Sequence, residues 1–188
     1  MSLKVKLTST IVAFMLILGL TIMGVFAAPT ATIQLGGSLN FKATDVHAKV
    51  TGVIAGTKVD PQPTLTDLVF EAGETTDVSS WANIPLQFTD AGSEITITVT
   101  IENLATDRPL YATVEDAVGS VDNVTKSMKK GSDAYTGDVI ELPASTGAGT
   151  STAVITLSMK VTDPNASIAD DATYGYSIEL NNEDPDAA

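Results

Sequence analysis

The chain carries few side chains whose chemistry suits catalysis. His47 is its single histidine, and it contains no cysteine. These two facts exclude zinc sites built from histidine and cysteine clusters, Cys–His nucleophile pairs and HExxH proteases. A Ser–His–Asp triad would have to use His47, which lies on the polar phase of a predicted strand, and no GxSxG motif precedes a helix. We therefore expect that the protein is not an enzyme.

Three pairs of adjacent carboxylates are the remaining candidates for acid–base chemistry: Glu115-Asp116, Asp170-Asp171 and Glu183-Asp184. Two such groups flank the scissile bond in glycoside hydrolases. Sugar-binding clefts usually offer aromatic rings as well, whereas this chain has 5% aromatic residues and a single tryptophan, Trp81. We interpret the paired acids as solvated loop residues.

Hard oxygen ligands gather in one segment near the C-terminus, and calcium is the metal that prefers such ligands. The segment contains Asp163, Asn165, Ser167, Asp170 and Asp171. It is not an EF-hand loop, because no glycine stands at its sixth position and no glutamate at its twelfth. The sequence offers it as a candidate structural calcium site, and we expect no other cofactor.

The balance of charge limits the class of partner. The chain has 23 Asp and Glu against 10 Lys and Arg, which gives a formal net charge of −13. Such a surface repels nucleic acid and anionic membranes and keeps a secreted protein soluble. We interpret the one basic cluster, residues 126–130 (KSMKK), as a loop that offsets local charge rather than as a nucleic-acid site.

The first 27 residues have the three parts of a secretory signal peptide. Lys4 and Lys6 form a cationic start, residues 11–25 are almost continuously apolar, and small residues lead to a cleavage site that we place after Ala27. The alternative is a retained membrane anchor, because the apolar run approaches the ~18–20 residues that span a bilayer. Cleavage would leave residues 28–188 as one domain, free of the membrane. Its net charge would be −15, since two lysines and no acid are removed.

Apolar and polar residues alternate with a period of two along most of the remaining chain, which is typical of half-buried strands. The clearest case is residues 94–103, where isoleucines and a valine alternate with threonines and a glutamate. Further strands are predicted at residues 31–43, 46–50, 65–70, 84–88, 110–114, 153–161 and 172–180. Residues 114–135 are less regular and leave room for one short helix.

Strands with one apolar side must bury those sides against each other. We therefore predict an all-β fold, a single antiparallel β-sandwich of the jelly-roll or Ig-like type. Antiparallel pairing is preferred because the chain has no long amphipathic helices to cover a parallel sheet. The parity of the alternation reverses at Thr44-Asp45, and such a reversal requires a bulge or a turn.

Cleavage after Ala27 would make an extended strand, residues 28–43, the new N-terminus. Its apolar phase and a Gly-Gly hinge comprise Ala31, Ile33, Leu35, Gly36, Gly37, Leu39 and Phe41. Such a strand can pair within its own sheet or complete the sheet of a neighbouring copy, and in the second case head-to-tail repetition gives a filament. The sequence alone leaves both alternatives open.

The order of these features resembles the TasA/camelysin family of secreted biofilm-matrix proteins. An apolar signal runs directly into a first strand, and the segment 86–99 (LQFTDAGSEITITV) continues through the turn 101–105 (IENLA) into 109–112 (PLYA). The strand 153–161, the Asp-rich loop 163–171 and the strand 173–180 follow. The resemblance implies a jelly-roll subunit that polymerises by donating its N-terminal strand.

We therefore expect a structural subunit of an extracellular filament or biofilm matrix, in which residues 28–43 supply the inter-subunit strand. Its partners would be copies of the same chain and other matrix or surface components. The alternative is a monomeric adhesion module at the cell surface, which would recognise glycan or protein through loops such as 142–152 and 163–171.

Overall fold

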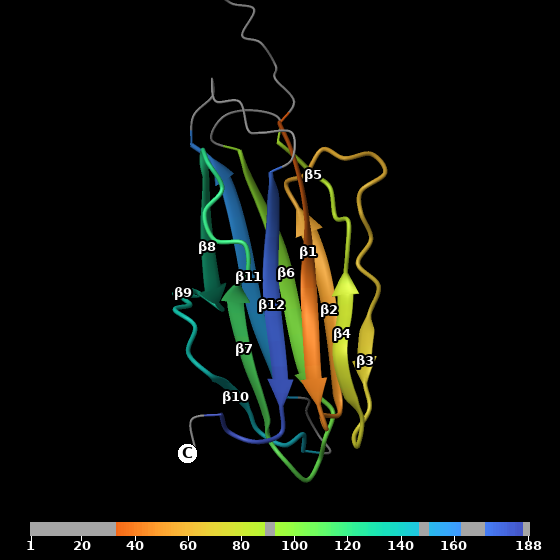
Figure 1. Cartoon of the computed structure of the whole chain (residues 1–188). Helices are drawn as coiled ribbons and strands as arrows, with labels where there is room; N and C mark the ends of the chain where they lie inside the picture. Colours follow the sequence, from red (N-terminus) through yellow and green to blue (C-terminus); the bar gives the residue numbers. More distant parts are fainter. Residues whose placement is uncertain (1–32, 89–92, 147–150, 163–171, 186–188) are drawn as a thin grey trace, which may run out of the picture. The chain divides into compact units, whose positions relative to one another are not determined.

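The computed structural model describes residues 33–88, 93–146, 151–162 and 172–185 (Figure 1). The predicted signal peptide, residues 1–27, and the residues from Ala28 to Thr32 lie outside these ranges. All regular structure in the described residues is β-strand, which confirms the all-β prediction. Within the same ranges no helix is long and apolar enough to span a membrane.

The strands form two six-stranded sheets. The strands are β1 (Ile33–Thr44), β2 (Ala48–Ala55), β3 (Leu68–Phe70), β4 (Thr75–Trp81), β5 (Leu86–Phe88), β6 (Glu94–Asn103), β7 (Leu110–Asp116), β8 (Val124–Lys130), β9 (Asp133–Ala134), β10 (Ile140–Leu142), β11 (Ser151–Val161) and β12 (Thr173–Asn181). The first sheet has the order β10-β7-β12-β1-β4, with β5 also pairing with β1. The second has the order β3-β2-β6-β11-β8-β9.

The alternating sequence determines which side chains enter the core. On β6 every second side chain from Ile95 to Ile101 is fully buried, and the threonines between them are not. On β12 the buried positions include Tyr176, Ile178 and Leu180. Buried side chains of both sheets belong to one hydrophobic cluster. Burying each large aliphatic side chain stabilises the fold by about 1.5–3 kcal/mol relative to exposure, so this shared core holds the two sheets together.

The prediction of purely antiparallel pairing is wrong for the first and last strands. β1 and β12 lie side by side and run in the same direction, with register partners from Gly36 and Thr173 to Thr44 and Asn181 (Figure 1). Parallel neighbours need a crossover connection, and here the intervening strands of both sheets supply it instead of a helix. Alternation specifies the face of a side chain but not the direction of the neighbouring strand, so the sequence pattern could not show this pair.

The described part of residues 114–135 contains no helix, so the suggestion of a short helix there is wrong. Residues 124–130 form β8, which pairs with β11. The basic cluster that we expected in a loop is therefore part of a strand. Its alternation is hidden because Lys126 occupies an inward position between Val124 and Met128.

The reversal of parity at Thr44-Asp45 is confirmed as a turn between the two sheets. Asp45 has a φ of 49°, in the left-handed region, and its backbone N–H donates to the carbonyl of Glu74. β1 ends before it in the first sheet, and β2 begins at Ala48 in the second. The turn therefore moves the chain from one sheet to the other, which exchanges the inward and outward phases.

Candidate functional site

Two unequal parts of β1 are held differently; they are called here its N-terminal half (Ile33–Leu35) and its C-terminal half (Gly36–Thr44). Residues Leu39–Thr44 pair with β4 on one side, and Gly36–Thr44 pair with β12 on the other. Ile33–Leu35 pair with β5, and no other strand of the described residues pairs with them. Among the described strands, the N-terminal half therefore has a neighbour on one side, whereas the C-terminal half is a central strand.

The inward residues predicted for the inter-subunit strand contribute to the core of their own chain. Leu35, Leu39 and Phe41 have at most 1% of their surface exposed. The ring of Phe41 meets Trp81 of β4 edge-on, with 4.9 Å between ring centroids. Ala31 lies outside the described residues, and Ile33 is the first residue of β1. The single chain thus places this strand in its own sheet.

Gly36 and Gly37 stand at the boundary between the two halves, and their surroundings differ. A Cβ atom built on Gly37 would overlap the ring and the carbonyl oxygen of Tyr174, its register partner on β12. No atom lies within 4 Å of a Cβ built on Gly36. Gly37 is therefore required by packing inside the core, whereas Gly36 leaves the backbone uncrowded at the point where pairing with β12 begins.

The connection between β4 and β5 crosses the same boundary. The N–H of Ile84 donates to the carbonyl of Gly37 over 3.0 Å, and the hydroxyl of Tyr174 donates to the carbonyl of Ile84 over 3.3 Å. The Ile84 side chain is 3% exposed. Burial raises the pKa of Tyr174 above its ordinary value, so the hydroxyl keeps its proton and remains a donor.

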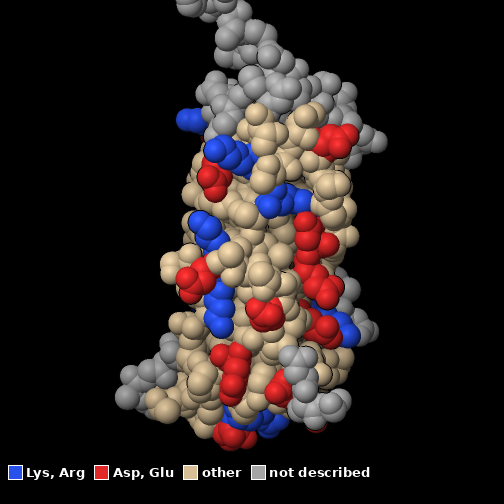
Figure 2. Space-filling view, turned by 90° about the vertical axis from the view of Figure 1, so that its left-hand side faces the viewer, with Lys and Arg blue, Asp and Glu red and all other residues tan. Residues whose placement is uncertain are grey.

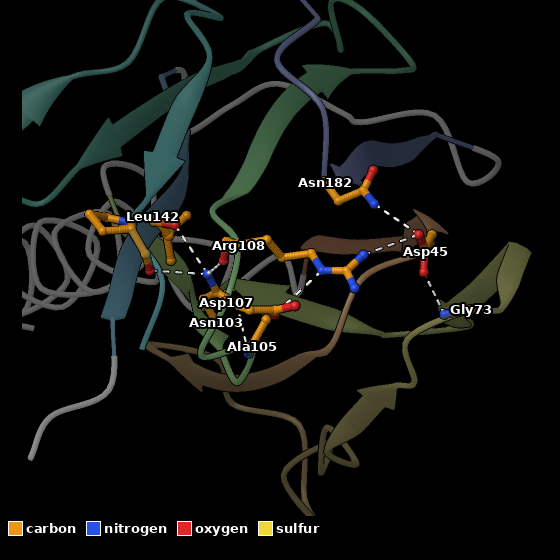
Figure 3. A network of polar contacts seen from close by, with 9 residues as sticks. Asp45, Gly73, Asn103, Ala105, Asp107, Arg108, Leu142 and Asn182 are labelled. Atoms are coloured by element: carbon orange, nitrogen blue, oxygen red, sulfur yellow. Dashed lines mark hydrogen bonds and ion pairs between the residues drawn. The ribbon is translucent and has the colours of Figure 1, made fainter. Parts of the chain in front are cut away.

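The C-terminal end of β1 is anchored by Asp45 (Figure 3). One carboxylate oxygen of Asp45 accepts from the backbone N–H of Gly73, and the other accepts from Arg108 Nη1 at 3.2 Å and Asn182 Nδ2 at 2.9 Å. These donors come from the β3–β4 turn, the β6–β7 connection and the residue that follows β12. Charge-assisted hydrogen bonds of this kind are stronger than neutral ones, so they fix the turn that leads out of β1.

Asn103, the last residue of β6, holds the neighbouring loops and was missed as a structural residue. It is 1% exposed, and the two hydrogens of its Nδ2 are shared among the carbonyls of Arg108, Leu142 and Pro143 over 3.0–3.2 Å. Its Oδ1 accepts from the N–H of Ala105 (Figure 3). The signal was present in the sequence, since Asn103 continues the inward phase of β6. A polar residue at an inward position must find partners there.

A partly buried ion pair lies between β7 and β8. Lys126 Nζ is 2.6 Å from Asp116 Oδ2, and the lysine side chain is 8% exposed. The ammonium also lies 5.8 Å from the centre of the Tyr176 ring. Figure 2 views the molecule from this side and shows acidic and basic residues interspersed over it, without a continuous basic patch. Lys126 thus pairs with an acid of its own chain.

The remaining candidates for chemistry do not gather in the described residues. His47 Nε2 lies 3.7 Å from Glu71 Oε2 in a pair whose side chains are 39% and 65% exposed. Of the paired acids, Glu115 is exposed and Asp116 is paired with Lys126. Within the described ranges, no three His, Cys, Asp or Glu residues form a group that could hold a metal ion.

The candidate calcium ligands Asp163, Asn165, Asp170 and Asp171 lie outside the described residues, together with Ser167. The loops of the alternative adhesion surface fall there in large part, because residues 147–150 and 163–171 are outside the same ranges. The site that the structure describes in full side-chain detail is therefore the boundary at Gly36-Gly37 with the residues that hold it. A scan of the chain against protein-family models finds no match, and no curated protein matches it.

Proposed function

We propose that the protein is a structural subunit of an extracellular filament or matrix and that copies of it assemble by exchanging the N-terminal part of the first strand. Residues 1–27 direct export and are removed. Residues 28–35 then pair with β5 of a neighbouring copy in place of their own. The partners are copies of the same chain and other matrix or surface components.

The observation that carries this proposal is that, among the described strands, Ile33–Leu35 pair with β5 alone, at the end of a central strand. Exchange between copies reproduces every contact that the closed chain makes, including the burial of Leu35 and the register with Leu86. Closed and exchanged forms therefore differ little in contact energy, and concentration decides between them. The rest of β1 stays in place, because β4, β12 and the Asp45 contacts hold it.

We also propose that the two sheets form a sandwich of the jelly-roll or Ig-like type. Two sheets that share one core and place the first and last strands side by side suit a jelly-roll or Ig-like sandwich. In such a fold the N-terminus can leave without opening the second sheet. The formal net charge of −13 suits a secreted protein, because repulsion between copies opposes unspecific association. Assembly then requires a specific contact such as the exchanged strand.

The test uses a pair of cysteines, because the natural chain has none. Gln34 and Gln87 are direct partners across β1 and β5, and directly opposite residues of antiparallel strands lie within reach of a disulfide. The double variant Gln34→Cys/Gln87→Cys of residues 28–188 is assembled under reducing conditions and then oxidised. We expect filaments by negative-stain microscopy and a ladder of covalently linked chains on a non-reducing gel.

The matched control is Asn40→Cys/Ser80→Cys, an antiparallel pair in the half of β1 that stays in place. It should form its bond within one chain and give no ladder. Removal of residues 28–35 should abolish filaments. A single-chain band for both cysteine pairs, with monodisperse protein at all concentrations, would overturn the proposal.

A further inference from the structure

We infer that residues 82–85, between β4 and β5, act as a latch that keeps the N-terminal half of β1 in its own sheet and so limits the rate of exchange. This inference rests on the proposed function for its consequence, although the latch itself can be measured in a single chain. The latch is defined as Ala82, Asn83, Ile84 and Pro85.

Ile84 connects the latch to the core of the first sheet. Its N–H and its carbonyl are both engaged, with Gly37 of β1 and with Tyr174 of β12, and its side chain is buried. One residue therefore joins the segment to the two central strands of the sheet at the boundary of the exchanging half. Releasing it requires two hydrogen bonds to break and one core side chain to leave.

β5 follows the latch directly in the chain. Pro85 is followed directly by Leu86, whose register partner is Leu35, the last residue of the N-terminal half. While Ile84 is held, β5 stays alongside its own β1. Asn83 has a φ of 55°, in the left-handed region, which asparagine adopts more readily than most residues with a side chain, so its residue type suits the turn that presents Ile84 to the core.

An open hollow lies beside the latch. Asn83 and Pro85 line an open hollow of about 570 Å³ together with Gly36, Ser38 and Asn40. Because no side chain fills the site above Gly36, the latch can move outward without displacing other parts of the sheet. The hydroxyl of Tyr174 is the contact whose removal loosens the latch without changing the packing of the ring.

The chain provides a matched control for this test. Tyr174 and Tyr176 are both buried on β12, with ring centroids 6.4 Å apart. The Tyr174 hydroxyl donates to Ile84, whereas the buried Tyr176 hydroxyl has no hydrogen-bond partner among the described residues. Tyr174→Phe and Tyr176→Phe each remove one hydroxyl from the same core, and only the first touches the latch.

Hydrogen exchange of the monomeric protein, measured at low concentration, tests the latch without polymers. Tyr174→Phe should speed exchange of the amides at 33–35 and 86–88 by about five- to tenfold, the effect of one hydrogen bond on an opening equilibrium. The amides of β6 should be accelerated by no more than this factor, because global unfolding breaks the same hydrogen bond only once. Tyr176→Phe should not speed exchange in either region, because it breaks no hydrogen bond among the described residues. Equal exchange in the two variants would refute the latch.

Assembly is measured separately as the rate of interchain bond formation in the Gln34→Cys/Gln87→Cys background. We expect Tyr174→Phe to raise this rate severalfold and Tyr176→Phe to leave it unchanged. Faster local exchange without faster interchain bonding would show that the latch does not limit assembly, which would overturn the inference. Absence of interchain bonds in the parent cysteine variant would instead overturn the proposed function, while the hydrogen-exchange result would still decide whether the latch exists.

Discussion

At the scale of single residues, the polar side chains at inward positions do more for this fold than the exposed acids. Asn103 faces three carbonyls with its NH2 group and accepts from one N–H at the end of β6. Lys126 occupies an inward position by pairing with Asp116. In each case burial is tolerated because the group has partners, and loss of the group would leave those partners unsatisfied.

Asn103→Ala should lower the free energy of unfolding by about 2–4 kcal/mol. It removes every hydrogen bond of a side chain that is 1% exposed and leaves buried carbonyls without a donor. Urea denaturation followed by circular dichroism measures the effect. The control is Glu102→Ala on the outward face of β6, which should change stability by less than about 0.5 kcal/mol. Equal losses in the two variants would show that the Asn103 contacts are unimportant.

At the scale of elements, β1 combines two kinds of strand in one segment. Its C-terminal half has neighbours on both sides, an ion pair between Lys42 and Glu179 at 3.0 Å, and the Asp45 turn at its end. Its N-terminal half has β5 alone among the described strands. The two glycines between them are not equivalent, because Tyr174 fills the space beside Gly37.

Gly37→Ala and Gly36→Ala should therefore have opposite effects. The methyl group at position 37 would overlap the Tyr174 ring and carbonyl, and we expect a loss of about 1–3 kcal/mol from overpacking. The methyl group at position 36 meets no atom within 4 Å, and we expect a change between zero and a gain of about 1 kcal/mol, because alanine restricts the unfolded chain. Thermal and urea unfolding of both variants measure the difference. A loss at position 36 as large as that at position 37 would contradict this account.

At the scale of the whole described domain, the two sheets enclose two tyrosines, Tyr174 and Tyr176, whose ionisation is opposed by burial. Burial raises the pKa values of Tyr174 and Tyr176 above the ordinary value of 10.0, and in Tyr176 the nearby charge of Asp116 adds to the effect. Above pH 10 the unfolded chain loses these protons and the folded chain keeps them. The stabilisation is fully present below pH 10 and is lost as the pH rises beyond it.

Stability should therefore fall above pH 10 by about 1.4 kcal/mol per pH unit for each of the two tyrosines. Urea denaturation at a series of pH values from 8 to 11.5 measures the slope, with the range chosen to bracket the ordinary pKa of 10.0. The double variant Tyr174→Phe/Tyr176→Phe should remove most of it. Should the variant lose stability in alkali as steeply as the natural chain, another group must be responsible.

The sequence predicts long, regular strands well and short strands poorly. The strands at 94–103 and 153–161 were predicted to within two residues of β6 and β11, because their alternation is long and regular. β3 and β5 are three residues each, shorter than the predicted 65–70 and 84–88. In the second case the difference is Ile84-Pro85, which belongs to the latch. The latch could not be predicted, because it depends on Gly37 and Tyr174, which are distant in the chain.

The sequence by itself determined that the described chain is all-β, which side chains are buried in the strands with regular alternation, and where the phase reverses at Asp45. Those properties are local, since the period of two follows from the backbone of one strand. Only the tertiary structure decided that β1 lies parallel to β12, that Lys126 takes an inward position beside Asp116 and that Ile84 is held at the boundary within β1. These depend on pairs such as Lys42 and Glu179, which are 137 residues apart, and alternation carries no information about which strand lies alongside or in which direction it runs.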